Sequence, residues 1–502
     1  METTSQRIGT AMAWSVLARA ARFVLGFASS IVVVRGLGDH GYGVLSLVRS
    51  ILMLVVTVAG LGSGQALLKF LPALRVARST RAARRIVRRV ALVHLLSWCA
   101  LVLAALLARP WVERTFAADG IGVILVAGVA LALFEVFFTF ASQILNASFD
   151  ARRLSIAGIV SHAVYLVALA IVLPLGMGVL GVLAAAAAGN AAACVLIAGR
   201  LEPATRFGDA DAGSDFGAAR ILRYSAPFAV IGVLNIVVWR QSETILLGHF
   251  RSAEETGFFD LAYRMPQTIL EFVPGTVWPL VMAGMSEAFA RDRSSLRGVV
   301  ERYYRLLFLV CAPICALGAV VAVRAVSVLY GSAMEPAGVP MALFFMILTV
   351  SFLSTPLSMA LYVLEKTHLN LVIYCILAVV NVGLDLLLIP KYGVPGAILP
   401  VAIAIALQPL AYYAVVRRHV PDVTIPFAFI GRCFLASASV LVALPILHWV
   451  SGALGLAVAM LTAGAAVLLA YRIGRVPAEA ELAALAAIPA PGAGRIADFF
   501  RR

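Results

Sequence analysis

The sequence predicts an all-α integral membrane protein with about 14 transmembrane helices. Of its 502 residues, 62% are hydrophobic and only 13% are charged, and the mean hydropathy is +0.99. Soluble domains are about 45–50% apolar and about 25% charged. Apolar runs of about 20 residues, the length that crosses a bilayer as a helix, recur from residue 12 to residue 471. The connections between them are too short for an extramembrane catalytic domain.

Fourteen apolar runs are long enough to span the membrane, and their order defines the expected elements. The expected spans are 12–34, 42–63, 88–108, 121–143, 154–174, 178–199, 224–247, 257–284, 303–323, 338–362, 369–389, 394–416, 427–449 and 453–471. The first run is not a signal peptide, because Arg19 and Arg22 interrupt its apolar stretch and no cleavage site follows it.

An internal repeat predicts two six-helix lobes. Gly178 to Gly181 opens the sixth run and Gly393 to Gly396 opens the twelfth, while Arg49 and Arg264 are also about 215 residues apart. Both halves start on the same side, so we expect parallel lobes related by a pseudo-twofold axis along the membrane normal. The expected organisation is an N-lobe of helices 1–6 (1–200), a cytoplasmic linker (201–223), a C-lobe of helices 7–12 (224–420), helices 13–14 (421–475) and a cytoplasmic tail (476–502).

The distribution of basic residues predicts the orientation. With a cytoplasmic N-terminus, 28 of the 40 Lys and Arg residues fall on the cytoplasmic side, six fall outside and six lie within the spans. The positive-inside rule therefore places both termini in the cytoplasm, in a multi-pass protein of the cytoplasmic (inner) membrane. The net charge of +15 follows from the same bias. Loops that face lipid headgroups explain it, and no nucleic-acid partner is expected.

Five arginines inside the spans are the most informative feature of the chain. An arginine at mid-bilayer costs roughly 2.5–3.5 kcal/mol if it faces lipid. We therefore expect Arg19, Arg22, Arg49, Arg240 and Arg264 to line a shared water-filled cavity. The guanidinium group is a planar fork of donors that suits phosphate oxygens, so the expected cargo is a phosphate or pyrophosphate.

Helical spacing arranges the buried polar residues as one stripe on each of five helices. The stripes are Ser15, Arg19, Arg22, Gly26 and Ser29; Ser46, Arg49, Met53 and Thr57; Glu135, Thr139, Ser142 and Asn146; Asp260, Arg264, Gln267 and Glu271; and Asn370, Tyr374, Asn381 and Asp385. The expected substrate-binding residues are the five arginines with Glu135, Gln267 and Glu271. The alternative is that Arg49 pairs with Glu135, or Arg264 with Glu271, and that these pairs only join helices.

The carboxylates of the second half suggest a cation site. Asn381 and Asp385 are one helical turn apart, and Glu243 ends the seventh span. Two carboxylates and an amide oxygen form an oxygen-rich site suited to Na⁺, or a protonatable pair. A plain helix–helix hydrogen bond is the alternative. No cofactor is expected, and Na⁺ or H⁺ is the expected coupling ion.

Several loose motifs, in a fixed order, resemble the Wzx-like oligosaccharide-lipid flippases, which share a superfamily with lipid II flippases and multidrug-and-toxin exporters. The segments that carry the resemblance are Arg35 to Gly43, Glu243 to Gly248, Gly257 to Ala262, Leu329 to Gly331 and Ile389 to Gly396. The resemblance implies a two-lobed transporter that moves a polyprenyl-pyrophosphate-linked glycan across the bilayer. It also implies glycan polymerases and glycosyltransferases of the same pathway as partners.

The resemblance also implies roles for individual residues. By similarity to the lipid II flippases, pyrophosphate binding and gating fall to Arg22, Asp39, Arg49 and Arg264, and a Na⁺ site to Glu243, Asn381 and Asp385. Two departures weaken the Na⁺ site: Glu243 replaces the usual aspartate, and Val401 lacks the expected hydroxyl.

The alternatives are a transporter of another substrate, an enzyme, and a structural scaffold for other glycan enzymes, which would leave the buried charges unexplained. A drug or organic-cation exporter of the same superfamily would hold cationic substrates against acidic residues, whereas the expected cavity is cationic. An integral-membrane glycan polymerase would need a large polar outer loop, and the longest expected one, about 109–120, is too short. We therefore expect a transporter of the lipopolysaccharide and O-antigen type, and not an enzyme.

Overall fold

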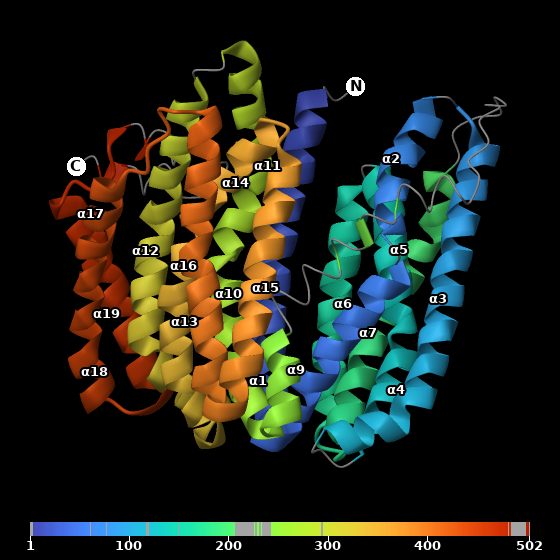
Figure 1. Ribbon diagram of the computed structural model, residues 1–502. Coiled ribbons are helices and arrows are strands. Elements are labelled where there is room, and N and C mark those ends of the chain that lie inside the picture. Colours follow the sequence, from blue (N-terminus) through green and yellow to red (C-terminus); the bar gives the residue numbers. More distant parts are fainter. Residues whose placement is uncertain are drawn as a thin grey trace. The chain divides into compact units, whose positions relative to one another are not determined.

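A computed structural model describes residues 4–60, 62–76, 78–116, 120–148, 150–205, 242–292 and 295–479, with short stretches at 225, 228–229, 232, 481–482 and 498–500. Every element within these ranges is a helix (Figure 1). The all-α membrane fold expected from the sequence is therefore confirmed. The chain divides into two compact units, a first unit (Met1–Gly257) and a second unit (Phe258–Arg502).

The first unit is described in the following helices, given in chain order. They are α1 (Thr4–Gly60), α2 (Ser63–Val76), α3 (Thr80–Thr115), α4 (Ile121–Leu131), α5 (Leu133–Ala147), α6 (Ala151–Val172), α7 (Gly178–Ala204), α9 (Ser242–Phe250) and the first turn of α10 (Ala253–Leu270). One apolar core joins α2, α3 and α5 around Leu67, Ile86 and Ile144. A second joins α5, α6 and α7 around Leu145, Ala157 and Ala193.

The second unit continues α10 and adds the remaining helices. They are α11 (Phe272–Arg291), α12 (Ser295–Tyr330), η2 (Ser332–Ala337), α13 (Gly338–Ser351), α14 (Thr355–Val363), α15 (Thr367–Tyr392), α16 (Val394–His419), α17 (Phe427–Ser437), η3 (Ala438–Val442), α18 (Ala443–Trp449) and α19 (Gly452–Ile473). The two C-terminal apolar runs pack on α12 through a core that includes Ala312, Cys433 and Ala463.

Eleven helical segments among the described residues are long and apolar enough to cross a membrane. Twelve of the fourteen expected spans lie in these segments, because Leu17–Gly60 contains the first two. The expected seventh span, 224–247, lies mostly outside the described residues. The expected eighth span, 257–284, is divided between α10 and α11.

The break between the first two expected spans is a single residue. Gly38 has φ 69° and ψ −174°, a conformation that is open essentially only to glycine, and the two helical parts of α1 meet there. The next residue, Asp39, accepts a hydrogen bond from the backbone N–H of His40 at 2.8 Å. The side chain of His40 contacts Glu254 at the start of α10, with Nδ1 2.6 Å from Oε1. This contact joins the break in α1 to α10.

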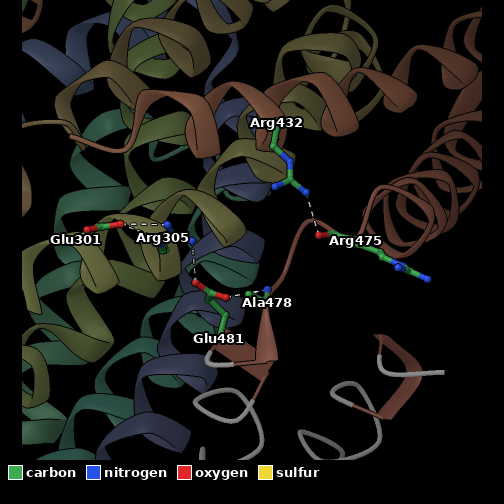
Figure 2. Close-up of polar contacts among 6 residues, drawn as sticks. All are labelled: Glu301, Arg305, Arg432, Arg475, Ala478 and Glu481. Carbon is green, nitrogen blue, oxygen red and sulfur yellow. Dashed lines mark hydrogen bonds and ion pairs between the residues drawn. The ribbon is translucent and has the colours of Figure 1, made fainter. Parts of the chain in front are cut away.

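The segment after α19 is held by Arg432 of α17, within the second unit. Arg432, which the sequence places inside the thirteenth span, donates from Nη2 to the carbonyl oxygens of Gly474 and Arg475 at 3.0 Å each. Figure 2 shows its guanidinium pointing at the chain that leaves α19. A cation at a helix C-terminus stabilises the last, otherwise unsatisfied carbonyls. Arg432 therefore anchors the turn that follows α19.

The first residues of the expected tail are also held in place. Glu481, 5% exposed, accepts from the backbone N–H of Ala478 at 2.7 Å and lies 3.6 Å from Arg305 of α12 (Figure 2). Arg305 also pairs with Glu301 at 3.0 Å. Glu481 thus caps the turn that begins at Ala478 and ties it to α12.

Candidate functional site

Arg22 lies on α1 in the first unit and is exposed. Its Nε donates to the carbonyl oxygen of Ala18 at 3.3 Å, and its side chain runs across Gly158 of α6. Arg19, one turn earlier, is close enough to repel it. Among the described residues, Arg22 forms no ion pair with a carboxylate. The guanidinium therefore keeps donors for an anion.

Arg49 lies in the second part of α1 and Glu135 in the first turn of α5. Arg49 is partly exposed and Glu135 is exposed, and the two side chains attract each other electrostatically. Within the described part of the chain, no ion pair of 4 Å or less joins Arg49 to a carboxylate. The direct Arg49–Glu135 pair considered from the sequence is therefore not formed.

The polar stripe on α5 continues from Glu135 along an accessible face. Thr139 and Asn146 are exposed, and Ser142, which is partly exposed, donates to the carbonyl oxygen of Phe138 at 2.7 Å. The stripe predicted from i, i+4, i+7 and i+11 spacing thus lies on one accessible side of the helix.

Two other residues predicted for the site, Asp39 and Glu243, have different surroundings. Asp39 is partly exposed beside the break at Gly38. Glu243 is buried, 4% exposed, in the first turn of α9. Arg240 lies outside the described residues.

The polar stripe on α10 forms two internal contacts in the second unit. Arg264 pairs with Asp260, with Nη2 2.7 Å from Oδ1, and Gln267 donates to Glu271 at 3.1 Å. The considered pairing of Arg264 with Glu271 is therefore wrong, because residues four apart on a helix face each other and residues seven apart are two turns distant. Arg264 remains 31% exposed, so part of its guanidinium is accessible.

Asn381 and Asp385 are both buried in α15, at 2% and 0% exposure. Asn381 donates from Nδ2 to Asp385 Oδ2 at 3.2 Å, which turns the amide oxygen of Asn381 away from that bond. Amide and carboxylate oxygens are suitable ligands for Na⁺. In the described ranges, no group of three or more His, Cys, Asp or Glu residues could hold a metal ion. The cation site stays a prediction.

Sequence reasoning missed one residue beside Arg22. His162, within the fifth apolar run, lies one turn after Gly158 on the side of α6 that contacts α1. Its ring is partly exposed and interacts electrostatically with Arg22. A lone histidine in an apolar run gives no signal of this proximity, which arises only when α1 and α6 pack together.

Comparison with known proteins gives one family and several similar folds. The model of a family described as "Polysaccharide biosynthesis protein" matches residues 32–338, more than half of the chain. No curated protein matches the sequence.

Among solved structures, the lipid II flippase MurJ in an inward closed conformation is similar with a TM-score of 0.69 at 13% identity, over 91% of this chain and 98% of that one. An inward-facing multidrug resistance MATE family transporter of the MOP superfamily has a TM-score of 0.67 at 16% identity, with coverage of 81% and 98%. A MOP superfamily transporter from Pyrococcus furiosus, described as having a binding pocket of reverse polarity, has a TM-score of 0.56 at 16% identity, with coverage of 83% and 96%. These similarities identify the fold.

Proposed function

The chain belongs to the polysaccharide biosynthesis protein family, and we propose from this premise that it is a flippase for a lipid-linked glycan. It moves a polyprenyl-pyrophosphate-linked oligosaccharide from the cytoplasmic to the outer leaflet of the cytoplasmic membrane by alternating access. It does not alter the covalent structure of this substrate. Polymerases and glycosyltransferases of the same pathway are its expected partners.

One observation carries this proposal: Arg22 and Arg49, on the two parts of α1, form no ion pair among the described residues. An arginine within an apolar helix is costly unless an anion or water solvates it. Three polar residues of α5, Glu135, Thr139 and Asn146, are exposed on one side of the helix, which supports a polar, accessible side in this unit. The diphosphate of a lipid-linked glycan supplies the anion that two guanidinium groups would bind.

In this proposal each part of the substrate binds where its chemistry fits. The diphosphate binds the arginines, the sugars occupy the polar, hydrated surface of the first unit, and the polyprenyl chain stays in the lipid. The inside-negative membrane potential favours outward movement of the charged headgroup by about 2.3 kcal/mol per charge per 100 mV. In the second unit, Asp260 holds the orientation of Arg264, the substrate-binding arginine expected on α10.

Return of the empty carrier is coupled to Na⁺ or H⁺ in this proposal. Asp385 would hold the cation or proton, and Asn381, one turn away on α15, would contribute its amide oxygen. Burial of both residues favours a dehydrated site for a small cation.

Binding of a polyprenyl-pyrophosphate glycan to the purified protein tests the proposal. We expect Arg49→Ala to weaken binding about 10- to 100-fold, because a hydrogen bond to a charged group contributes about 1.5–3 kcal/mol. Arg291→Ala is the matched control, since Arg291 is a 79% exposed surface arginine paired with Glu287. Tight binding of organic cations, with no binding of the diphosphate lipid, would instead support the drug-exporter alternative.

A further inference from the structure

A gap in α6 accommodates the side chain of Arg22. A Cβ atom placed on Gly158 would lie 3.1 Å from Arg22 Cδ and 3.3 Å from its Nη1. Both distances are tighter than ordinary van der Waals contact, so a methyl group at position 158 would require Arg22 to shift by a few tenths of an ångström, and a bulky side chain would require a larger shift. Glycine at this position allows the charged end of Arg22 to lie directly on the backbone of α6.

The ring of His162 lies at the same place. Its Nδ1 is 2.9 Å from the carbonyl oxygen of Gly158. A carbonyl oxygen can only accept a hydrogen bond, so Nδ1 carries the hydrogen and Nε2 is the nitrogen that gains or loses a proton. A Cβ on Gly26 of α1 would lie 3.9 Å from His162 Cδ2, the carbon bonded to Nε2. The titrating edge of the ring therefore faces α1.

The charged groups around this ring come from a small number of helices. The helices packed against α6 are α1, α5 and α7. Arg22 of α1 repels the ring when it is protonated, and Arg19 repels Arg22, so only an anion bound among these groups would offset the repulsion. On α5, Glu135 is attracted to Arg49. On α7, the polar partner of α6 is the uncharged Asn190, which accepts a hydrogen bond from Ser161 at 3.2 Å.

We propose that His162 is a further substrate-binding residue, which donates from protonated Nε2 to the same diphosphate that Arg22 binds. This role rests on the proposed function. A neutral ring presents a lone pair at Nε2 and cannot donate to a phosphate oxygen, whereas the protonated ring adds a donor and a positive charge. The bound diphosphate therefore favours proton uptake by His162, and headgroup affinity rises as the pH falls through the histidine range.

The inference makes the affinity for a diphosphate lipid pH-dependent in a defined direction. A diphosphate diester keeps one charge on each phosphate between pH 5.5 and 7.5, so the change must come from the protein. We expect polyprenyl-pyrophosphate glycan in phosphatidylcholine nanodiscs to bind about tenfold more tightly at pH 5.5 than at pH 7.5. His162→Gln should remove most of this difference, and His162→Lys should keep tight binding at both pH values.

His419→Gln is the matched control. His419, near the end of α16, makes the same contact between its Nδ1 and the carbonyl oxygen four residues earlier, at 3.1 Å from Val415, but it is exposed and far along the chain from α6. This substitution should leave the pH dependence unchanged. Unfolding of each variant in detergent would verify that it remains folded.

The outcomes separate the inference from the proposed function. If the wild-type protein binds the lipid and His162→Gln has the same affinity and pH dependence, the role of His162 is refuted and the flippase proposal stands. If the wild-type protein binds no diphosphate lipid at either pH, both are refuted. A Gly158→Leu variant gives an independent check, since it should weaken binding by displacing Arg22 even where His162 is intact.

Discussion

A double-mutant cycle of Arg49 and Glu135 distinguishes a binding site from a structural ion pair. The cycle compares the wild-type protein with Arg49→Gln, Glu135→Gln and the double variant. Glutamine keeps most of the side-chain volume and removes the charge, so the coupling reports mainly on electrostatics.

The expected coupling in stability follows from exposure and separation. Glu135 is exposed, Arg49 is partly exposed, and no ion pair of 4 Å or less joins Arg49 to a described carboxylate. Exposed charge pairs contribute about 0–1 kcal/mol, whereas breaking a buried pair in contact costs about 3–5 kcal/mol. We therefore expect a coupling free energy below about 1 kcal/mol for unfolding.

The expected effect on lipid binding is larger than the effect on stability, and it has opposite directions in the two single variants. Arg49→Gln should weaken diphosphate-lipid binding about 10- to 100-fold, because it removes a charged donor. Glu135→Gln should strengthen binding, because it removes a negative charge that attracts Arg49. Denaturant unfolding in detergent micelles and lipid binding to the same samples measure the two quantities. A stability coupling of several kcal/mol, with lipid binding unchanged by Arg49→Gln, would show that the pair only joins helices.

Three further predictions concern the other contacts. The hydrogen bond from His40 lowers the pKa of Glu254 below its ordinary value of 4.5, so this contact stabilises the protein above that pH and is lost as the pH falls through the lowered pKa. Glu254→Gln should therefore make thermal stability less dependent on pH below about pH 4.5. A pH dependence equal to that of the wild-type protein would contradict this prediction. Glu481→Gln should lower the free energy of unfolding by about 1 kcal/mol, mainly because it weakens the hydrogen bond to Ala478. The same variant should be cleaved faster by a protease in the tail. Cleavage of the tail at the wild-type rate would refute this. Asp385→Asn should make transport in vesicles independent of a Na⁺ or H⁺ gradient, and retained gradient dependence would remove Asp385 from the coupling site.

Much of the fold could be predicted because membrane helices leave a simple signal. A bilayer-spanning helix must satisfy its backbone internally, so its length and apolar character are visible in the sequence. Polar stripes were also visible, since period 3.6 alone places Glu135, Thr139 and Asn146 on one face. The break at Gly38 was visible only as a gap between two apolar runs.

The remaining features depend on contacts between distant segments. The sequence alternative paired Arg264 with Glu271, which is two helical turns away. In the structure Arg264 pairs with Asp260, the residue four positions earlier on the same helix. The proximity of His162 to Arg22 depends on how closely α6 approaches α1 at Gly158. Glu481 falls in the expected cytoplasmic tail, where the Ala-rich sequence has no periodic pattern that predicts burial, yet it is buried against α12.

Transport in proteoliposomes tests the central claim most directly. The protein would be reconstituted with a fluorescent polyprenyl-pyrophosphate oligosaccharide, and its transfer between leaflets followed by quenching from outside. We expect the wild-type protein to accelerate transfer of the lipid between leaflets. The double variant with Arg22→Gln and Arg49→Gln should transfer the lipid at least about tenfold more slowly, whereas Arg291→Gln should keep the wild-type rate. Equal rates in the double variant and the wild-type protein would contradict binding of the diphosphate by these two arginines.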